Sequence, residues 1–219
     1  MSKPLRNLMS AVFWEVRIDP PRSAADQMEI DAQLFRDFES GLIGPTIRFY
    51  TFEKPAVTLG YRQSPKEIPL LFPDLSLAVD TSRRPTGGGA VLHHPSDLTY
   101  ALVHLFDLPE GRQSFRRIYQ RMTTLFCEEL RRLGIPARLA RRGAPDHSRD
   151  PARCFSGAEP YEVVATGKKI LGVAQRRGRR GLLQQGTLQA DIDGAGRERL
   201  IRGLLERLSD QALLEVASR

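Results

Sequence analysis

The sequence predicts an α+β protein in which a mostly antiparallel or mixed β-sheet is flanked by helices. Three observations support this fold class. Short apolar runs typical of strands recur along the chain, two longer segments carry apolar residues at helical spacing, and strands and helices do not alternate regularly as in doubly wound folds. No internal repeat occurs. We expect a single domain over residues 1–219, with its core at about 24–208 and no C-terminal accessory domain.

In the N-terminal half, residues 24–40 carry apolar side chains at helical spacing and are followed by Gly41, which predicts a helix that ends there. Residues 46–52 alternate as in a strand, and residues 56–60 are expected to pair with them as a hairpin across Lys54 and Pro55. Further strands are expected at 77–79, 90–92 and 98–105.

A second helix is predicted from a cap at Ser114 to Leu133, with Gly134 as its end. Its core-facing stripe is Ile118, Met122, Leu125, Phe126, Leu130 and Leu133. Residues 141–153 are polar and rich in Gly and Pro, which indicates a mobile surface loop. A hairpin is expected from 161–165 to 169–174, then a strand at 182–189 and helices at 196–208 and 210–217.

Charge is concentrated in one part of the chain. The net charge is +7, and residues 138–180 carry eleven Lys or Arg against four Asp or Glu, so this segment holds the whole excess. An acidic partner is expected, either nucleic acid or an acidic protein domain. Few aromatic residues and no nucleic-acid motif accompany the charge, which makes nucleic acid the more distant alternative.

The composition also limits the compartment and the cofactors. No apolar run is long enough to span a membrane and residues 1–10 lack a signal-peptide core, so we expect a cytoplasmic protein without membrane contact. Cys127 and Cys154 are too few for a disulfide framework. Neither these cysteines nor His93 and His94 have a metal-ligand spacing, so no metal site is expected.

Three consecutive glycines, Gly87 to Gly89, follow the pair Arg83-Arg84 and precede an apolar run. Such a run indicates either a plain glycine hairpin or a close approach of a ligand to backbone N–H groups. The preceding arginines favour a phosphate, a carboxylate or an acyl carbonyl as that ligand. Adjacent histidines on a strand face opposite ways, so at most one of His93 and His94 points into this site.

Cys154 is the candidate nucleophile of the chain. It follows Arg153 at the end of the basic loop and precedes Lys169 by fifteen positions, and a nearby cation favours the nucleophilic thiolate. The alternative is a small buried residue. Lys169 is either an exposed strand-edge residue or a buried functional amine. Cys127 lies beside Phe126 in the second helix, where a packing role is favoured.

Together these segments resemble the lipoate and octanoate members of the biotin and lipoate protein ligase superfamily. The resemblance runs through most of the chain: it includes 28–34, 45–50, 55–63, RRPTGGGAVLH at 83–93, DLTY at 97–100, Cys154-Phe155 with Tyr161-Glu162, GKKILGVAQR at 167–176 and QQGTL at 184–188. It implies the class II biotin/lipoyl ligase-like catalytic fold. Cys154 in its Cys-Phe, Tyr-Glu and Gly-Lys-Lys context is closest to the LipM-type octanoyltransferases, and lipoate-protein ligase A comes next.

The resemblance implies an acyltransferase that moves octanoate from acyl carrier protein to Cys154 and then to a lysine of a lipoyl domain or the glycine cleavage H protein, with no cofactor. Lys169 would stabilise the Cys154 thiolate. The implied substrate-binding residues are Arg84, Thr86, Gly87, Gly88, Gly89, His93, Gly186 and Thr187. The basic residues expected to dock the acidic partner are Arg176, Arg177, Arg179 and Arg180.

Two alternatives accompany this interpretation. Gly89 stands where the transferases often carry Arg, which makes the glycine run more ligase-like, and an ATP-dependent lipoate-protein ligase or its catalytic subunit would need ATP and Mg. A non-catalytic protein that binds acyl groups or lipoyl domains would instead have an unreactive Cys154.

Overall fold

The structure is a computed structural model that describes residues 15–75, 79–105, 107–108, 111–112, 115–140 and 152–208. Its elements in chain order are β1 (Glu15–Ile18), α1 (Ala24–Ser40), β2 (Thr46–Tyr50), β3 (Ala56–Leu59), the 3₁₀ turn η1 (Pro65–Glu67), α2 (Ile68–Leu71), β4 (Asp80–Arg83), β5 (Val91–His93), β6 (Leu98–Leu105), β7 (Asp107–Leu108), β8 (Gly111–Arg112), α3 (Phe115–Arg132), β9 (Ala137–Leu139), β10 (Val163–Ala165), β11 (Lys168–Arg177), β12 (Gly181–Leu188) and α4 (Gly194–Arg207).

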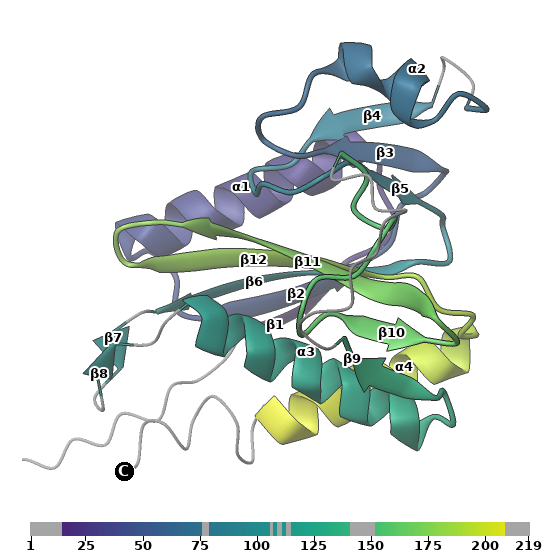
Figure 1. Ribbon diagram of the computed structural model, residues 1–219. Coiled ribbons are helices and arrows are strands. Elements are labelled where there is room, and N and C mark those ends of the chain that lie inside the picture. Colours follow the sequence, from purple (N-terminus) through teal and green to yellow (C-terminus); the bar gives the residue numbers. More distant parts are fainter. Residues whose placement is uncertain are drawn as a thin grey trace, which may run out of the picture.

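A seven-stranded sheet in the order β1-β2-β6-β12-β11-β10-β9 forms the centre of the molecule (Figure 1). Adjacent strands of this sheet pair antiparallel except for β1 and β2, which are parallel. The predicted α+β class with a mixed sheet is therefore confirmed. All residues of the central strand β12 are buried, because both faces of the sheet are covered.

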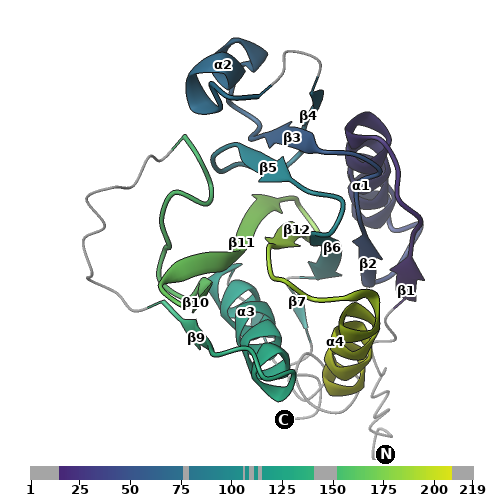
Figure 2. The same cartoon turned by 90° about the vertical axis from the view of Figure 1, so that its right-hand side faces the viewer.

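The two faces of this sheet are covered differently. Helices α3 and α4 lie side by side on one face, whereas α1 and the smaller sheet lie on the other (Figures 1 and 2). The α3 stripe that the sequence predicts, including Ile118, Met122 and Phe126, fills the core on the first face. Leu34, Phe35 and Phe38 of α1 fill the core on the second. On the second face, the seven-stranded sheet is therefore opposed by the smaller sheet, and the region between the two sheets lies there (Figure 2).

The smaller sheet has the order β4-β3-β5, and it corrects the predicted hairpin of residues 46–52 with 56–60. Both strands exist, but β2 pairs with β6 in the large sheet, and β3 pairs with β4 and β5. Every residue of β2 and β3 is buried, so the alternation of side chains carried no information about which strands are partners.

The remaining predicted elements agree with the structure in most cases. The helix at 24–40 ends at Gly41 with φ +80°, and the 161–174 hairpin forms β10 and β11. The strand expected at 77–79 is wrong at Val79, which precedes β4. Ser114, residues 77–78, the 141–151 part of the expected loop and the helix expected at 210–217 lie outside the described residues. None of the described helices combines the length and apolarity needed to cross a bilayer.

Candidate active site

Cys154 is fixed beside the end of the glycine run. Its backbone N–H donates to the carbonyl of Ala90 at 2.9 Å, and the N–H of Ala90 donates to the carbonyl of Ala152 at 2.7 Å. Arg153 and Ala90 form a parallel β-bridge. This pairing holds the half-buried Cys154 side chain between the two sheets. The thiol is therefore positioned by backbone hydrogen bonds and not by the surrounding loop alone.

Lys169 points at Cys154 from the start of β11. Its Nζ lies 3.4 Å from the Cys154 Sγ and donates to the Cys154 carbonyl oxygen at 2.6 Å. The same ammonium lies 2.8 Å from Glu162 Oε2, and the Lys169 side chain is only 3% exposed. Of the two alternatives that the sequence leaves open for Lys169, the structure therefore supports the buried amine and not the exposed strand edge.

Glu162 completes this arrangement, and the sequence analysis gave it no role beyond a place in a motif. Its carboxylate is buried and accepts hydrogen bonds from Lys169, from the backbone N–H of Glu159 at 2.8 Å and from the Tyr119 hydroxyl. Burial raises the pKa of Glu162, and the Lys169 ammonium opposes that rise. The signal in the sequence that could have identified Glu162 is its place directly before β10, since β10 pairs with the start of β11, where Lys169 lies.

Gly172 makes room for the thiol and the amine. A Cβ at this position would lie 3.0 Å from the Cys154 Sγ, 3.0 Å from the Lys169 Cε and 3.1 Å from the Phe155 ring. Contacts of this length are tighter than nearly all real Cβ contacts. The absence of a side chain at Gly172 therefore lets Cys154 and Lys169 approach the strand.

Arg84 organises the glycine run. Its buried guanidinium donates to the carbonyls of Gly87 at 2.9 Å, Gly89 at 2.6 Å and Thr58 at 2.8 Å. Gly88 has φ +86°, a conformation that side chains rarely adopt. The run connects β4 with β5, which both pair with β3, so the plain hairpin that the sequence left open is wrong. Burial lowers the pKa of Arg84, and interaction with the Cys154 charge opposes this shift.

A small cavity between the two sheets contains the thiol and is lined mainly by apolar surface. Of the residues named from the resemblance, it brings together Cys154, Arg84, His93, Gly186 and Thr187. Its apolar lining includes Met28, Val91, Val173 and Ala174. Gly87 and Gly88 instead line a neighbouring open pocket of about 510 Å³. The cavity, with a volume of about 30 Å³, therefore places apolar surface directly next to the nucleophile.

Thr86 does not line the cavity. Its fully buried hydroxyl donates to Gln185 Oε1 at 2.7 Å, and Gln185 Nε2 donates to Asp31 Oδ2 at 2.6 Å. Asp31 in turn pairs with the buried Arg48. This network, which the sequence analysis missed because its members lie on separate elements, ties the glycine run to β12, α1 and β2.

Only one of the two adjacent histidines reaches the cavity, as the sequence predicts, although His94 follows β5 and is not part of the strand. His94 is exposed, whereas His93 lines the cavity and its Nε2 lies 2.8 Å from the Thr58 hydroxyl. Burial lowers the pKa of His93 to about 3, so this imidazole is neutral at physiological pH. Its buried Nδ1 has no hydrogen-bond partner among the described residues.

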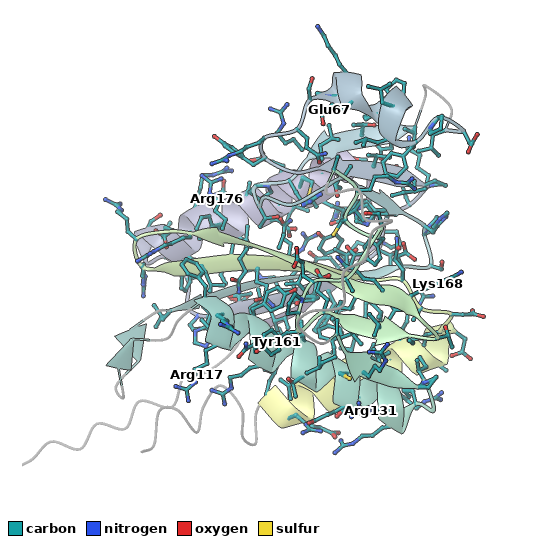
Figure 3. All side chains as sticks on the ribbon, in the orientation of Figure 1. Glu67, Arg117, Arg131, Tyr161, Lys168 and Arg176 are labelled. Carbon is teal, nitrogen blue, oxygen red and sulfur yellow. The ribbon has the colours of Figure 1, made fainter. Side chains whose placement is uncertain are left out.

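The four arginines expected to dock a partner are all exposed around the turn from β11 to β12. Figure 3 shows Arg176 at the opposite end of β11 from Lys168. Arg176 differs from the others because it lines the open pocket beside the glycine run. Arg180 donates to the Phe38 carbonyl, and Glu39 accepts from the backbone N–H groups of Arg179 and Arg180.

The described residues contain no group of three side chains that could hold a metal ion. What they bring together is a thiol, an ammonium and a carboxylate beside an apolar cavity. The thiol can attack a carbonyl carbon, and the ammonium can stabilise both the thiolate and a developing oxyanion. The arrangement is therefore suited to covalent acyl transfer.

The model of the lipoyl protein ligase A/B catalytic domain matches residues 23–218. The chain belongs to this family. An octanoyltransferase LipM of Kyrpidia tusciae is 33% identical over 204 residues, covering 90% of this chain and 73% of that protein. Octanoyltransferase LipM of Clostridioides difficile is 31% identical over 201 residues, and the match covers 91% of this chain and 74% of that protein. A lipoate-protein ligase A bound with ATP has a similar fold, with a TM-score of 0.69 at 21% identity and coverage of 93% of this chain and 90% of that one.

Proposed function

We propose that this chain is an octanoyltransferase that moves octanoate from acyl carrier protein, through a thioester on Cys154, to a lysine of a lipoyl domain or of the glycine cleavage H protein. The observation that carries the proposal is the 3.4 Å contact between the Lys169 ammonium and the Cys154 thiol at the wall of an apolar cavity. The LipM relatives support the same substrate class.

The first half-reaction forms an acyl-enzyme. The Cys154 thiolate attacks the carbonyl carbon of the donor thioester, and a new C–S bond to Cys154 forms. The tetrahedral intermediate then collapses with cleavage of the donor's C–S bond, and the carrier thiolate leaves and takes up a proton. Lys169 stabilises negative charge at each stage, because its ammonium stays next to the sulfur and is held there by Glu162.

The second half-reaction transfers the acyl group to the acceptor. The neutral amine of the acceptor lysine attacks the Cys154 thioester, the C–S bond breaks, and an amide forms while the amine loses a proton. Cys154 returns as a thiolate beside Lys169. Both steps start from a thioester, so neither needs ATP, and amide formation drives the second step forward.

The alternative is an ATP-dependent lipoate-protein ligase that acts through an acyl-adenylate and needs ATP and Mg. The ligase neighbour supports only the fold at its level of identity. A buried ammonium placed against a thiol favours the transferase, since an acyl-adenylate route has no use for a thiolate at this position.

The test is a pair of transfer assays to a lipoyl domain, one with purified octanoyl-acyl carrier protein and one with free octanoate, each run with and without ATP. The transferase forms octanoyl-lysine from octanoyl-acyl carrier protein at the same rate with and without ATP. Product that requires ATP and free octanoate would contradict the proposal and support the ligase. No product in either condition would support the non-catalytic alternative.

A further inference from the structure

The open pocket next to the glycine run carries two guanidinium groups and is separate from the cavity that contains Cys154. Its lining is Tyr61, Arg62, Pro85, Gly87, Gly88, Gln175 and Arg176. Arg62 and Arg176 are both exposed side chains at its wall. No acidic residue lines it. An anion is therefore the ligand that this lining favours.

The glycine run, of which Gly87 and Gly88 line this pocket, also carries backbone N–H donors. The carbonyls of Gly87 and Gly89 accept from Arg84, and this anchors the run. In the part of the chain that the structure describes, no protein acceptor takes a hydrogen bond from the N–H groups of Gly87, Gly88 and Gly89. Successive N–H groups beside a residue of positive φ, here Gly88 at +86°, form the concave arrangement that binds phosphate oxygens in other proteins.

A continuous face of β11 leads from Cys154 to this pocket. Residues two apart on a strand share a face, so Gly172, Ala174 and Arg176 lie in one row. The first lies against the Cys154 sulfur, a Cβ built on Gly88 would lie 3.7 Å from the Ala174 Cβ, and Arg176 lines the pocket. Four residues of strand span roughly 13 Å. This row of β11 residues therefore connects the thiol with the pocket along one face of the strand.

Arg176 is held in place for binding at the end of this row. Its guanidinium lies 5.7 Å from the ring centroids of both Phe35 and Tyr61 and 3.5 Å from the carbonyl oxygen of Pro85. A guanidinium oriented in this way loses less side-chain entropy when it binds an anion than a free surface arginine does.

We propose that this pocket binds the phosphate of the donor's phosphopantetheine arm, with Arg62, Arg176 and the N–H groups of Gly87 and Gly88 as its ligands. The inference rests on the proposed function, because it requires a thioester donor whose acyl group reaches Cys154. It assigns Arg176 to the small-molecule part of the donor and leaves Arg177, Arg179 and Arg180 to the protein surface around it.

The experiment compares two small thioesters, octanoyl-phosphopantetheine and octanoyl-pantetheine, which differ only in the phosphate. Loading of Cys154 is followed by intact mass, and KM is measured for each thioester. The test variant is a double variant that carries both Arg62→Gln and Arg176→Gln. The control variant is Arg199→Gln with Arg202→Gln, two exposed arginines of α4 on the other side of the large sheet.

The unmodified protein is expected to have a lower KM for the phosphorylated thioester. The test variant should raise that KM by about tenfold or more, because charge-assisted hydrogen bonds are lost, and should change the KM for octanoyl-pantetheine little. The control variant should change neither. Equal use of the two thioesters by the unmodified protein, or an equal loss with both in the test variant, would overturn the inference and leave the transferase standing.

A binding measurement separates the remaining outcomes. Calorimetric titration of the Cys154→Ser variant with free phosphopantetheine should show binding that the Arg62→Gln and Arg176→Gln substitutions abolish. If ATP binds there and phosphopantetheine does not, the inference is overturned in favour of a nucleotide site. If octanoyl-acyl carrier protein also fails to load Cys154 of the folded protein, the proposed function itself fails and the inference fails with it.

Discussion

At the scale of single residues, the proposed chemistry depends on one thiol and the groups that hold one ammonium against it. Lys169 contacts the Cys154 sulfur, the Cys154 carbonyl and the Glu162 carboxylate, and its ammonium also lies over the Phe155 ring. These contacts hold the amine in one position and supply the acceptors that a buried ammonium needs.

Cys154→Ala is expected to abolish octanoyl transfer without unfolding the protein, because the half-buried side chain contributes little packing. The matched control is Cys127→Ala, since Cys127 lies in the α3 core away from the cavity. That variant should keep its activity and lose about 1 kcal/mol of stability from the lost packing. Transfer assays with thermal unfolding measure both effects, and an active Cys154→Ala variant would contradict the covalent mechanism.

Glu162→Gln should reduce kcat with little change in KM, because the residue positions Lys169 and is itself buried. We expect a loss of 10- to 100-fold, roughly 1.4 to 2.8 kcal/mol in the transition state. Iodoacetamide alkylation of Cys154 should slow in parallel, which a purely structural defect elsewhere would not produce. Tyr119→Phe, which removes only one donor to Glu162, should have a smaller effect. An unchanged alkylation rate of Cys154 in Glu162→Gln would show that Glu162 does not position Lys169.

The buried histidines make stability depend on pH. Burial lowers the pKa of His93 to about 3 and that of His104 to about 4. Each is neutral in the folded state while the unfolded chain takes up a proton below about 6.5, so stability present above that pH is lost as pH falls. Between pH 7 and pH 5, the free energy of unfolding should fall by up to about 2 kcal/mol for each histidine.

Urea unfolding at pH 7 and pH 5 tests this expectation. The difference in the free energy of unfolding between pH 7 and pH 5 should shrink in His93→Gln. It should stay unchanged in the exposed control His94→Gln. If both variants keep the full pH dependence, burial of neutral His93 is not its source.

At the scale of elements, the site exists because β11 carries small residues where the loop before β10 crosses it. Gly172→Ala places a Cβ within 3.0 Å of the Cys154 sulfur and the Lys169 Cε, so it should displace the pair. We expect at least a tenfold loss of kcat with the fold retained. Gly44→Ala, where a Cβ meets nothing within 4 Å, is the control. Equal activity of the two variants would show that the close packing at β11 is not needed.

The elements that the sequence predicted best are those whose signal is local. The caps at Gly41 and Gly134 and the apolar stripe of α3 each follow from a few neighbouring residues. The partner of β3 could not be predicted, because a fully buried strand has no polar face to indicate its register or sheet.

The same limit applies to the site. The sequence identified Cys154 and Lys169 as candidates and, through the resemblance, associated them with the glycine run. It could not identify the network that joins Thr86 to Gln185 and Asp31, because these residues are distant in sequence and meet only in the folded protein.

At the scale of the whole molecule, we propose that the exposed arginines around the β11–β12 turn promote encounter with an acidic protein partner. Charge reversal of Arg177, Arg179 and Arg180 should lower kcat/KM with octanoyl-acyl carrier protein at low salt. The effect should fade near 0.15 M salt, where the screening length is about 8 Å. Hydrolysis of octanoyl-pantetheine should be nearly unchanged. An equal loss with this small substrate would place these arginines in the active site.

The central claim is that Cys154 carries the acyl group between donor and acceptor. The most direct measurement is the intact mass of the protein after incubation with octanoyl-acyl carrier protein in the absence of ATP and acceptor. The mass should increase by one octanoyl group on Cys154, the adduct should be absent in Cys154→Ser, and a lipoyl domain added afterwards should receive the octanoyl group. An unmodified mass, with octanoylation of the lipoyl domain that still proceeds, would contradict the claim.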